Sequence, residues 1–177
     1  MKQQDSLGNL LFNPQGRIMK KRFWQGLILL TVASVIVTAL PVYLGSMFGL
    51  ASLLLIYPYI CVYAKRFHDA GTTGWWVLAV WLGSVILNMI EGMLFGPVFM
   101  GEDGRAIQEE AAERLAQGEF DVFLQAQERL AEIMLPLSIL TTVINAVVLG
   151  FIVGSLSTER RTNKHGPIPG TDHGEFR

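Results

Sequence analysis

The residues best suited to chemistry in this chain lie in positions 65–76, which hold two cations, a histidine, an aspartate, glycines and a tryptophan pair. Cations beside a membrane can meet lipid phosphates, and tryptophan is favoured at the level of the head groups. Arg17 adds a further guanidinium ahead of the first apolar run. This pattern predicts contact with a lipid head group or another anion. The candidate residues are Arg17, Lys65, Arg66, His68, Asp69, Trp75 and Trp76, and Lys164 could join them.

The same residues also suit a structural role, and the sequence leaves both interpretations open. His68 and Asp69 could fold the loop while the cations only fix the topology. Arg66 and Asp69 stand three positions apart, which allows an ion pair if the preceding helix continues that far.

A metal site is the third option for this stretch. His68, Asp69 and His165 are metal-ligand types, but the first two are adjacent and no H-x-x-x-H or C-x-x-C spacing exists. We therefore expect no metal and no cofactor.

A second set of polar residues lies within the apolar runs. Ser84, Asn88 and Glu91 recur at helical spacing, and residues 138–145 carry a similar stripe that ends at Asn145. If the stripes converge, they form a polar seam opening toward the outer face, with Ser84, Asn88, Glu91 and Asn145 as candidate residues. The seam could be a solute pathway or ordinary hydrogen bonding between helices.

Enzymatic patterns are missing from the sequence. It contains no evident nucleophile–base pair, no paired catalytic carboxylates, and neither a Walker nor a Rossmann glycine pattern. We expect a protein that is not an enzyme.

Three long apolar runs must position these residues. Hydrophobic residues make up 51% of the 177-residue chain and charged ones only 16%, against about 25% in a soluble domain. Residues 23–64, 70–90 and 133–158 contain no Asp, Glu, Lys or Arg. A run of about 18 apolar residues is typical of a membrane span. This composition argues against a soluble globule, and the single cysteine, Cys61, excludes an intramolecular disulfide.

The first run is too long for one crossing, at 1.5 Å of rise per helical residue. Pro41 and residues 44–46 supply a break. We therefore predict an all-α integral membrane four-helix bundle, with Pro136 in the first turn of the fourth helix. The expected spans are 23–42, 47–64, 74–94 and 135–156.

Charge placement predicts the orientation. Every Lys and Arg except Arg105, Arg114 and Arg129 falls before the first span, between the second and third, or after the fourth. The positive-inside rule then places both termini in the cytoplasm.

The segment between spans three and four, residues 101–133, is rich in acidic residues. Ile107, Ala111 and Leu115 recur every four residues, and Gly118 interrupts the pattern. We predict an amphipathic helical hairpin, serving either as a partner-binding or gating cap or only as a solvated connection.

Several short motifs together resemble one known family. They are Gly16-Arg17-Ile18, Phe23-Trp24, the stretch 65–76, and the tail motif 163–167, in which Lys164 and His165 depart from the family pattern. The chain resembles the bacterial membrane family called domain of unknown function 805. Relative to typical members of that family, segment 101–133 of this chain looks like an insertion. The resemblance implies a small multi-pass protein of the bacterial inner membrane and implies no reaction.

The sequence thus divides into a cytoplasmic segment (1–22), three spans (23–100), the outer insertion (101–133), a fourth span (134–157) and a cytoplasmic tail (158–177). We expect a non-enzymatic module that contacts lipid head groups or a membrane partner through its inner basic and aromatic face. The alternative is a small transporter or channel subunit that uses the polar seam with Glu91. Anionic lipid, an unknown membrane protein or a second copy are the expected partners, and nucleic acid is not.

Overall fold

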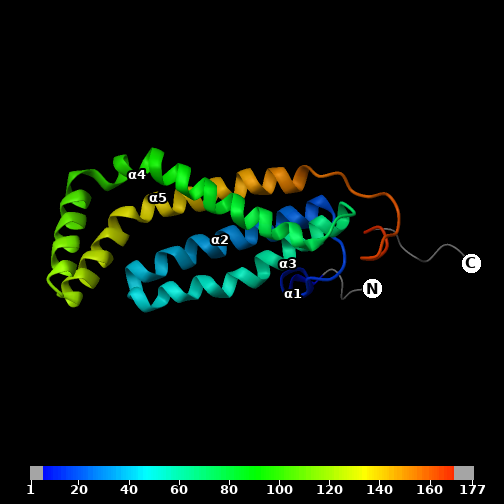
Figure 1. Ribbon diagram of the computed structural model, residues 1–177. Helices are drawn as coiled ribbons and strands as arrows, with labels where there is room; N and C mark the ends of the chain where they lie inside the picture. Colours follow the sequence, from blue (N-terminus) through cyan, green and yellow to red (C-terminus); the bar gives the residue numbers. More distant parts are fainter. Residues whose placement is uncertain (1–5, 170–177) are drawn as a thin grey trace, which may run out of the picture.

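The computed structural model describes residues 6–169, and this range is helical apart from turns and an isolated bridge between Asn163 and Gly166 (Figure 1). Four of its helices are long and apolar enough to cross a membrane, which confirms the predicted all-α fold with four spans. Lys2 and Arg177, two of the cations counted above, lie outside the described residues.

The chain alternates long helices with short connections. In order, the elements are α1 (Leu7–Phe12), α2 (Lys20–Leu44), the 3-10 helix η1 (Ser46–Ser52), α3 (Leu53–Asp69), the 3-10 helix η2 (Gly74–Trp76), α4 (Val77–Ala116) and α5 (Phe120–Ser155). The break between the first two spans falls at Gly45, whose φ of 103° suits a residue without a side chain.

Two local expectations are wrong. Residues 65–69, which we expected to belong to the connecting loop, form the last turns of α3, because Arg66 and Asp69 pair within the helix. Pro136 does not lie in a first turn, since α5 begins at Phe120 and runs through it. Proline lacks the N–H that would bond to the preceding turn. The helix continues through Pro136 nonetheless, because α5 packs against α2 and α4.

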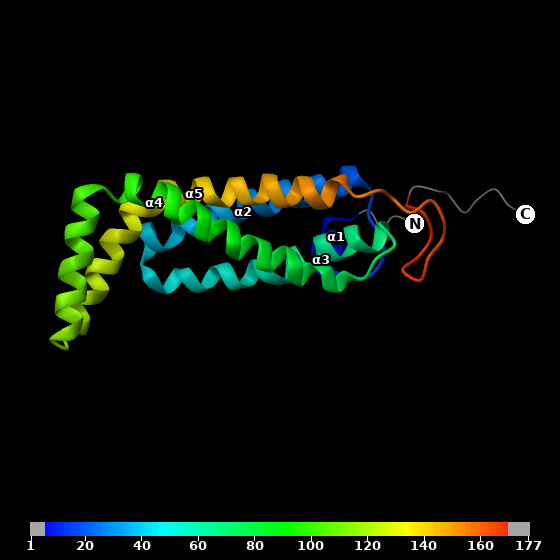
Figure 2. The same cartoon turned by 45° about the horizontal axis from the view of Figure 1, so that its top comes forward.

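The spans pack in the order α3, α2, α5, α4. In Figures 1 and 2, α3 and α4 diverge from each other on the way from their connecting loop toward the far end. These two helices contact each other little. The bundle is consequently open on one side.

Close packing between α2 and α5 depends on two glycines. A Cβ at Gly150 would overlap Cδ2 of Leu27, and one at Gly154 would lie 3.1 Å from Nε1 of Trp24. Small residues at helix contacts allow this approach, which is a common way to join spans in lipid.

The segment between the third and fourth spans forms the predicted amphipathic hairpin. α4 bends at Gly101, where φ is 61°, and the chain reverses at Gly118, where φ is 81°. Ala111 and Ala126 are buried in the hairpin. Both ribbon views show the hairpin turning aside from the axis of the bundle (Figures 1 and 2).

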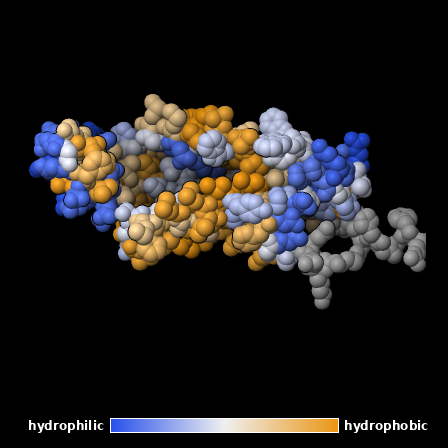
Figure 3. Space-filling view, turned by 60° about the horizontal axis from the view of Figure 1, so that its bottom comes forward, coloured by the Kyte–Doolittle hydropathy of each residue, from blue (hydrophilic) through white to orange (hydrophobic). Residues whose placement is uncertain are grey.

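The outer surface fits a lipid environment. Figure 3 shows mostly apolar surface along the middle of the molecule, with some hydrophilic patches within it, hydrophilic surface at the end that carries the tail, and an apolar patch ringed by hydrophilic residues at the hairpin. Large apolar side chains such as Leu54, Trp81 and Phe151 are exposed. In water such a surface would promote aggregation, whereas lipid solvates it. The protein is a multi-pass membrane protein.

Candidate functional site

We call the end of the bundle that holds α1, the 70–73 loop and the tail (residues 156–169) the basic end. At its centre, Arg66 and Asp69 occupy the last turn of α3, and both side chains are fully buried. Nη1 of Arg66 donates to Oδ2 of Asp69 at 2.6 Å. Its Nη2 donates to the carbonyls of Gly154 and Leu156, where α5 ends. Arg66 therefore joins α3 to the end of the last span.

Arg17 completes this cluster from the segment before α2. Its Nη2 and Nε lie 3.2 and 3.3 Å from Oδ1 of Asp69. The same guanidinium donates to the carbonyls of Glu159, at 2.5 Å, and Arg161, at 2.8 Å, with a longer bond of 3.4 Å to Gly166. The Arg17 side chain is only 1% exposed. Arg17, Arg66 and Asp69 are called the arginine–aspartate cluster.

The tail folds back onto Asp69 as well. Thr158 Oγ1 donates to Oδ2 of Asp69 at 2.7 Å, and the Glu159 backbone N–H donates to the Asp69 carbonyl at 2.8 Å. Asn163 donates to the His68 carbonyl and to Oε2 of Glu159. The hydrogen bonds from Asn163 and Arg161 lower the pKa of Glu159. Each Asp69 oxygen thus has a donor, as a buried carboxylate requires.

Lys65 has a separate task. Its side chain is buried, and its ammonium donates to the carbonyls of Asn9 and Leu10 and to Oδ1 of Asn9. α1 is only six residues long, and these hydrogen bonds fasten it to α3.

His68 and His165, which the sequence offered as metal-ligand types, lie in contact although they are far apart in the sequence. The rings of His68 and His165 stack with centroids 3.7 Å apart and planes 6° apart. Nδ1 of His68 donates to the Gly16 carbonyl at 3.1 Å. Stacked rings do not direct their nitrogens at a common point, and Asp69 is occupied by arginines. Within residues 6–169 there is no group of three or more His, Cys, Asp or Glu that could hold a metal ion.

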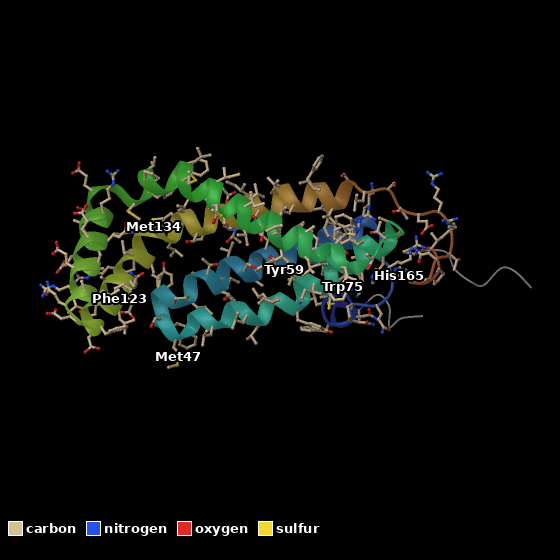
Figure 4. All side chains as sticks on the ribbon, viewed as in Figure 1. Met47, Tyr59, Trp75, Phe123, Met134 and His165 are labelled. Atoms are coloured by element: carbon tan, nitrogen blue, oxygen red, sulfur yellow. The ribbon has the colours of Figure 1, made fainter. Side chains whose placement is uncertain are left out.

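The tryptophan pair lies on the surface at the basic end. Trp75 is 76% exposed and Trp76 is 55% exposed. Figure 4 places Trp75 and His165 at the same end of the molecule, far from Phe123 in the hairpin.

The geometry separates the predicted site residues into two groups. Arg17, Lys65 and Arg66 direct their N–H groups at protein oxygens, so in this arrangement they are not the groups that meet a phosphate. Their burial favours the structural interpretation for this group. Trp75 and Trp76 remain available to the surroundings. Exposed cations at the same end are Lys20, Lys21, Arg160, Arg161 and Lys164. Of these, Lys20 donates to the Ser155 carbonyl at 3.2 Å and Arg161 pairs with Glu159.

Sequence reasoning missed the tail residues that complete the cluster. Thr158 and Glu159 carry no spacing signal that points to Asp69, because the two long helices α4 and α5 separate them from it in the sequence. Asn163 belongs to the tail motif, and that motif was the one signal from which a contact with the 65–76 stretch could have been expected.

The polar stripes of the third and fourth spans do converge. Asn145 Nδ2 donates to Oε2 of Glu91 at 3.0 Å and to the Thr141 carbonyl. Glu91 is only 4% exposed. Asn88 and Ser84 lie one and two turns from Glu91 on the same face of α4, and both line a cavity with Asn145.

Comparison with known proteins identifies one family. The chain matches the family described as "Protein of unknown function (DUF805)" over residues 11–167. No curated protein and no solved structure matches the chain. The match includes the motifs around Arg17, the 65–76 stretch and the tail.

Proposed function

Because this chain belongs to the DUF805 family of proteins of unknown function, we propose its role from its own geometry: a non-enzymatic membrane module whose basic end contacts anionic lipid head groups. The observation that supports the proposal is the combination of a rigid base with an exposed basic and aromatic rim. The base is the arginine–aspartate cluster, and the rim consists of Trp75, Trp76 and the exposed cations.

The chemistry of the rim suits an interface. An indole places an apolar ring in the acyl region and its N–H among the head groups. Each Lys or Arg near an anionic surface contributes about 1 kcal/mol of attraction. The proposal places the basic end at the cytoplasmic surface of a bacterial inner membrane, with both termini in the cytoplasm.

Lipid retention tests this proposal. Purified protein is incubated with equal amounts of phosphatidylglycerol and phosphatidylcholine, and bound lipid is counted by native mass spectrometry. Lys20→Gln with Lys21→Gln is expected to lower retention of phosphatidylglycerol several-fold and to leave phosphatidylcholine unchanged.

A matched control removes the same charge at the other end. Arg105→Gln with Arg129→Gln changes two exposed cations of the hairpin segment and is expected to retain wild-type binding. Contact through the basic end is contradicted if both double variants lose the same amount of phosphatidylglycerol retention. It is also contradicted if Lys20→Gln with Lys21→Gln loses none.

A second candidate function is passage of a solute along the polar seam, and the cavity beside Asn145 favours it. This candidate predicts slower solute flux in proteoliposomes after Asn88→Ala with Glu91→Ala. Unchanged flux removes it.

A further inference from the structure

A cavity of about 650 Å³ lies between α2, α3, α4 and α5. This volume falls in the range of roughly 300–1,000 Å³ that is usual for small-molecule sites. Figure 4 places one of its lining residues, Tyr59, near the middle of the bundle. The cavity therefore lies within the membrane-spanning part of the protein.

The mouth of the cavity opens toward lipid between α3 and α4. These helices contact each other little and diverge in Figures 1 and 2. The side chains at the mouth line the cavity and are also between 39% and 66% exposed, and they are Ile56, Ile60, Leu78 and Trp81. At this depth the surroundings are acyl chains. A ligand from the bilayer consequently reaches the cavity sideways.

The wall of the cavity carries no formal charge. Within residues 6–169, no Lys, Arg, His, Asp or Glu lines it. A charged group that entered would lose its hydration without gaining a counter-charge, which is costly within a membrane span. The ligand that fits is therefore uncharged, and the apolar side chains at the mouth suit an alkyl chain.

Hydroxyl donors lie on the side formed by α2 and α3. Ser34 Oγ and Tyr59 Oη are 3.0 Å apart, so one hydrogen of this pair joins the two oxygens and the other is left for a ligand. Thr38 lies one turn along α2 from Ser34 and also lines the cavity. Its hydroxyl has no hydrogen-bond partner among residues 6–169. Ser34, Thr38 and Tyr59 are called the donor wall.

Hydroxyl acceptors lie on the side formed by α4 and α5. Ser84 donates its hydroxyl hydrogen to the Trp81 carbonyl at 2.7 Å, and Thr142 donates to the Ser138 carbonyl at 2.8 Å. Both residues line the cavity. Since their hydrogens are engaged, these two oxygens can only accept a bond from a ligand. Ser84 and Thr142 are called the acceptor wall.

We propose that this cavity binds an uncharged single-chain amphiphile of the monoacylglycerol class. The ester carbonyl and hydroxyl oxygens of such a head group accept from the donor wall, and its hydroxyl hydrogens go to the acceptor wall. The acyl chain leaves through the mouth between α3 and α4. A phospholipid or a fatty acid anion carries charge that the wall does not match, and an alkane leaves both walls without partners.

This inference goes beyond head-group contact at the basic end, which is formed by other residues. It concerns binding and holds whether or not a solute crosses the bundle. Binding without flux would count against passage along the seam and not against the cavity as a site.

Equilibrium binding in nanodiscs tests the inference. The protein is placed in phosphatidylcholine nanodiscs, and labelled monododecanoylglycerol is added, with empty nanodiscs giving the background from partition into lipid. We expect saturable binding with one monoacylglycerol per chain. Absence of a saturable component overturns the proposal.

A variant of the donor wall assigns the binding to the cavity. Ser34→Ala, Thr38→Val and Tyr59→Phe together remove its hydroxyls and keep most of its volume. Binding is expected to weaken roughly tenfold, as the loss of two hydrogen bonds of ordinary net strength would. Thr31→Val is the matched control, because Thr31 is a hydroxyl of α2 that donates to the Leu27 carbonyl outside the cavity, and it is expected to bind as wild type. Equal binding by the triple variant overturns the role of the donor wall.

A competitor that can only accept hydrogen bonds separates the two walls. Methyl dodecanoate has an ester carbonyl and no hydroxyl, so it uses the donor wall and not the acceptor wall. Ser84→Ala with Thr142→Val is expected to weaken monododecanoylglycerol several-fold and to leave the affinity for methyl dodecanoate unchanged. An equal effect on both ligands, or on neither, contradicts the proposed arrangement of the head group.

Photocrosslinking of the wild-type protein tests the location without any variant. A monoacylglycerol with a diazirine near its head group is expected to label peptides that contain Tyr59 or Ser84, and excess unlabelled monododecanoylglycerol is expected to abolish that label. Label that is confined to lipid-facing positions outside the cavity, such as Phe151, overturns the assignment to this cavity.

Discussion

Asp69 is the residue on which the basic end depends. Its carboxylate pairs with Arg66 at 2.6 Å and with Arg17 at 3.2 Å, and all three side chains are buried. Asp69 also accepts from Thr158, so three separate segments of the chain meet at one carboxylate. Carbonyl oxygens from the end of α5 and the tail accept from further N–H groups of both arginines.

Removing this charge is expected to destabilise the protein strongly. Asp69→Asn leaves two buried guanidinium groups without a counter-charge, and the loss of one partner from a buried pair costs about 3–5 kcal/mol. Thermal unfolding in detergent, followed by circular dichroism, measures the effect. Glu110→Gln is the control, because Glu110 pairs with Arg114 at an exposed site and its loss is expected to cost less than about 1 kcal/mol.

Docking of the tail is expected to depend on pH through the stacked histidines. Burial first, and then the positive charges of Lys164 and Arg17, lower the pKa of His165, against the opposing effect of a hydrogen bond with the Thr72 backbone. The folded tail then binds fewer protons than the free tail, so its docking is complete above the ordinary histidine pKa of 6.5 and weakens as the pH falls below that value.

Hydrogen exchange of residues 159–167 measures this dependence. Exchange, corrected for its intrinsic change with pH, is expected to be faster at pH 5 than at pH 7.5. His165→Phe keeps a ring against His68 without the titrating group and is expected to reduce the difference. If exchange differs between pH 5 and pH 7.5 by the same factor in the wild type and in His165→Phe, titrating groups other than His165 cause the effect.

The sequence allowed the pairing of Arg66 with Asp69 without predicting it, because the spacing of three residues brings them together only if the helix continues to Asp69, as it does. It did not predict that Arg17 and Lys65 are buried. Burial of those cations depends on carbonyls from α1 and the tail, which approach only after the bundle has formed. A cation next to an apolar run has the same sequence pattern whether it faces phosphate or a carbonyl oxygen.

At the scale of elements, the contact between α2 and α5 is set by Gly150 and Gly154. Leu27 and Trp24 lie so close to these positions that no Cβ fits without movement. Three glycine pairs with this spacing lie in or beside the apolar runs, and the sequence alone does not distinguish those that pack from those that do not. A Cβ added at Gly92 or Gly96 would meet no neighbouring atom within 4 Å, so this pair faces open space.

These glycines are expected to respond in opposite directions to the same substitution. Gly150→Ala places a methyl against Leu27, which is buried, and overpacking of this kind costs about 1–3 kcal/mol. Gly92→Ala meets nothing and gains helix propensity of up to about 1 kcal/mol. Unfolding temperatures in one detergent compare them. If both variants are equally stable, the α2–α5 contact is looser than described.

Element boundaries were less predictable than element number. Hydropathy fixes how many helices cross the membrane, because each needs an apolar run of known length. It does not fix where a helix ends in water. α4 and α5 both extend beyond the apolar runs into the hairpin, and their amphipathic continuation has its own helical pattern there.

At the scale of the whole molecule, charge is separated along the bundle. The basic end carries most of the cations, and the hairpin carries an excess of carboxylates. Between them the spans of residues 6–169 show a mostly apolar surface (Figure 3). This charge distribution predicts that the basic end faces the cytoplasm, because the positions of Lys and Arg set the orientation in which a membrane protein inserts.

Cysteine labelling tests that orientation with little background. Cys61, the single cysteine, is fully buried and is expected not to react with a membrane-impermeant maleimide. A cysteine at the exposed Gln108 of the hairpin (Gln108→Cys) is expected to react in intact spheroplasts. Lys164→Cys, in the exposed tail, is expected to react only after the membrane is permeabilised, because the positive-inside rule places the tail in the cytoplasm. The reverse pattern would place the basic end outside, and the proposed contact with cytoplasmic anionic lipid would then fail together with the orientation.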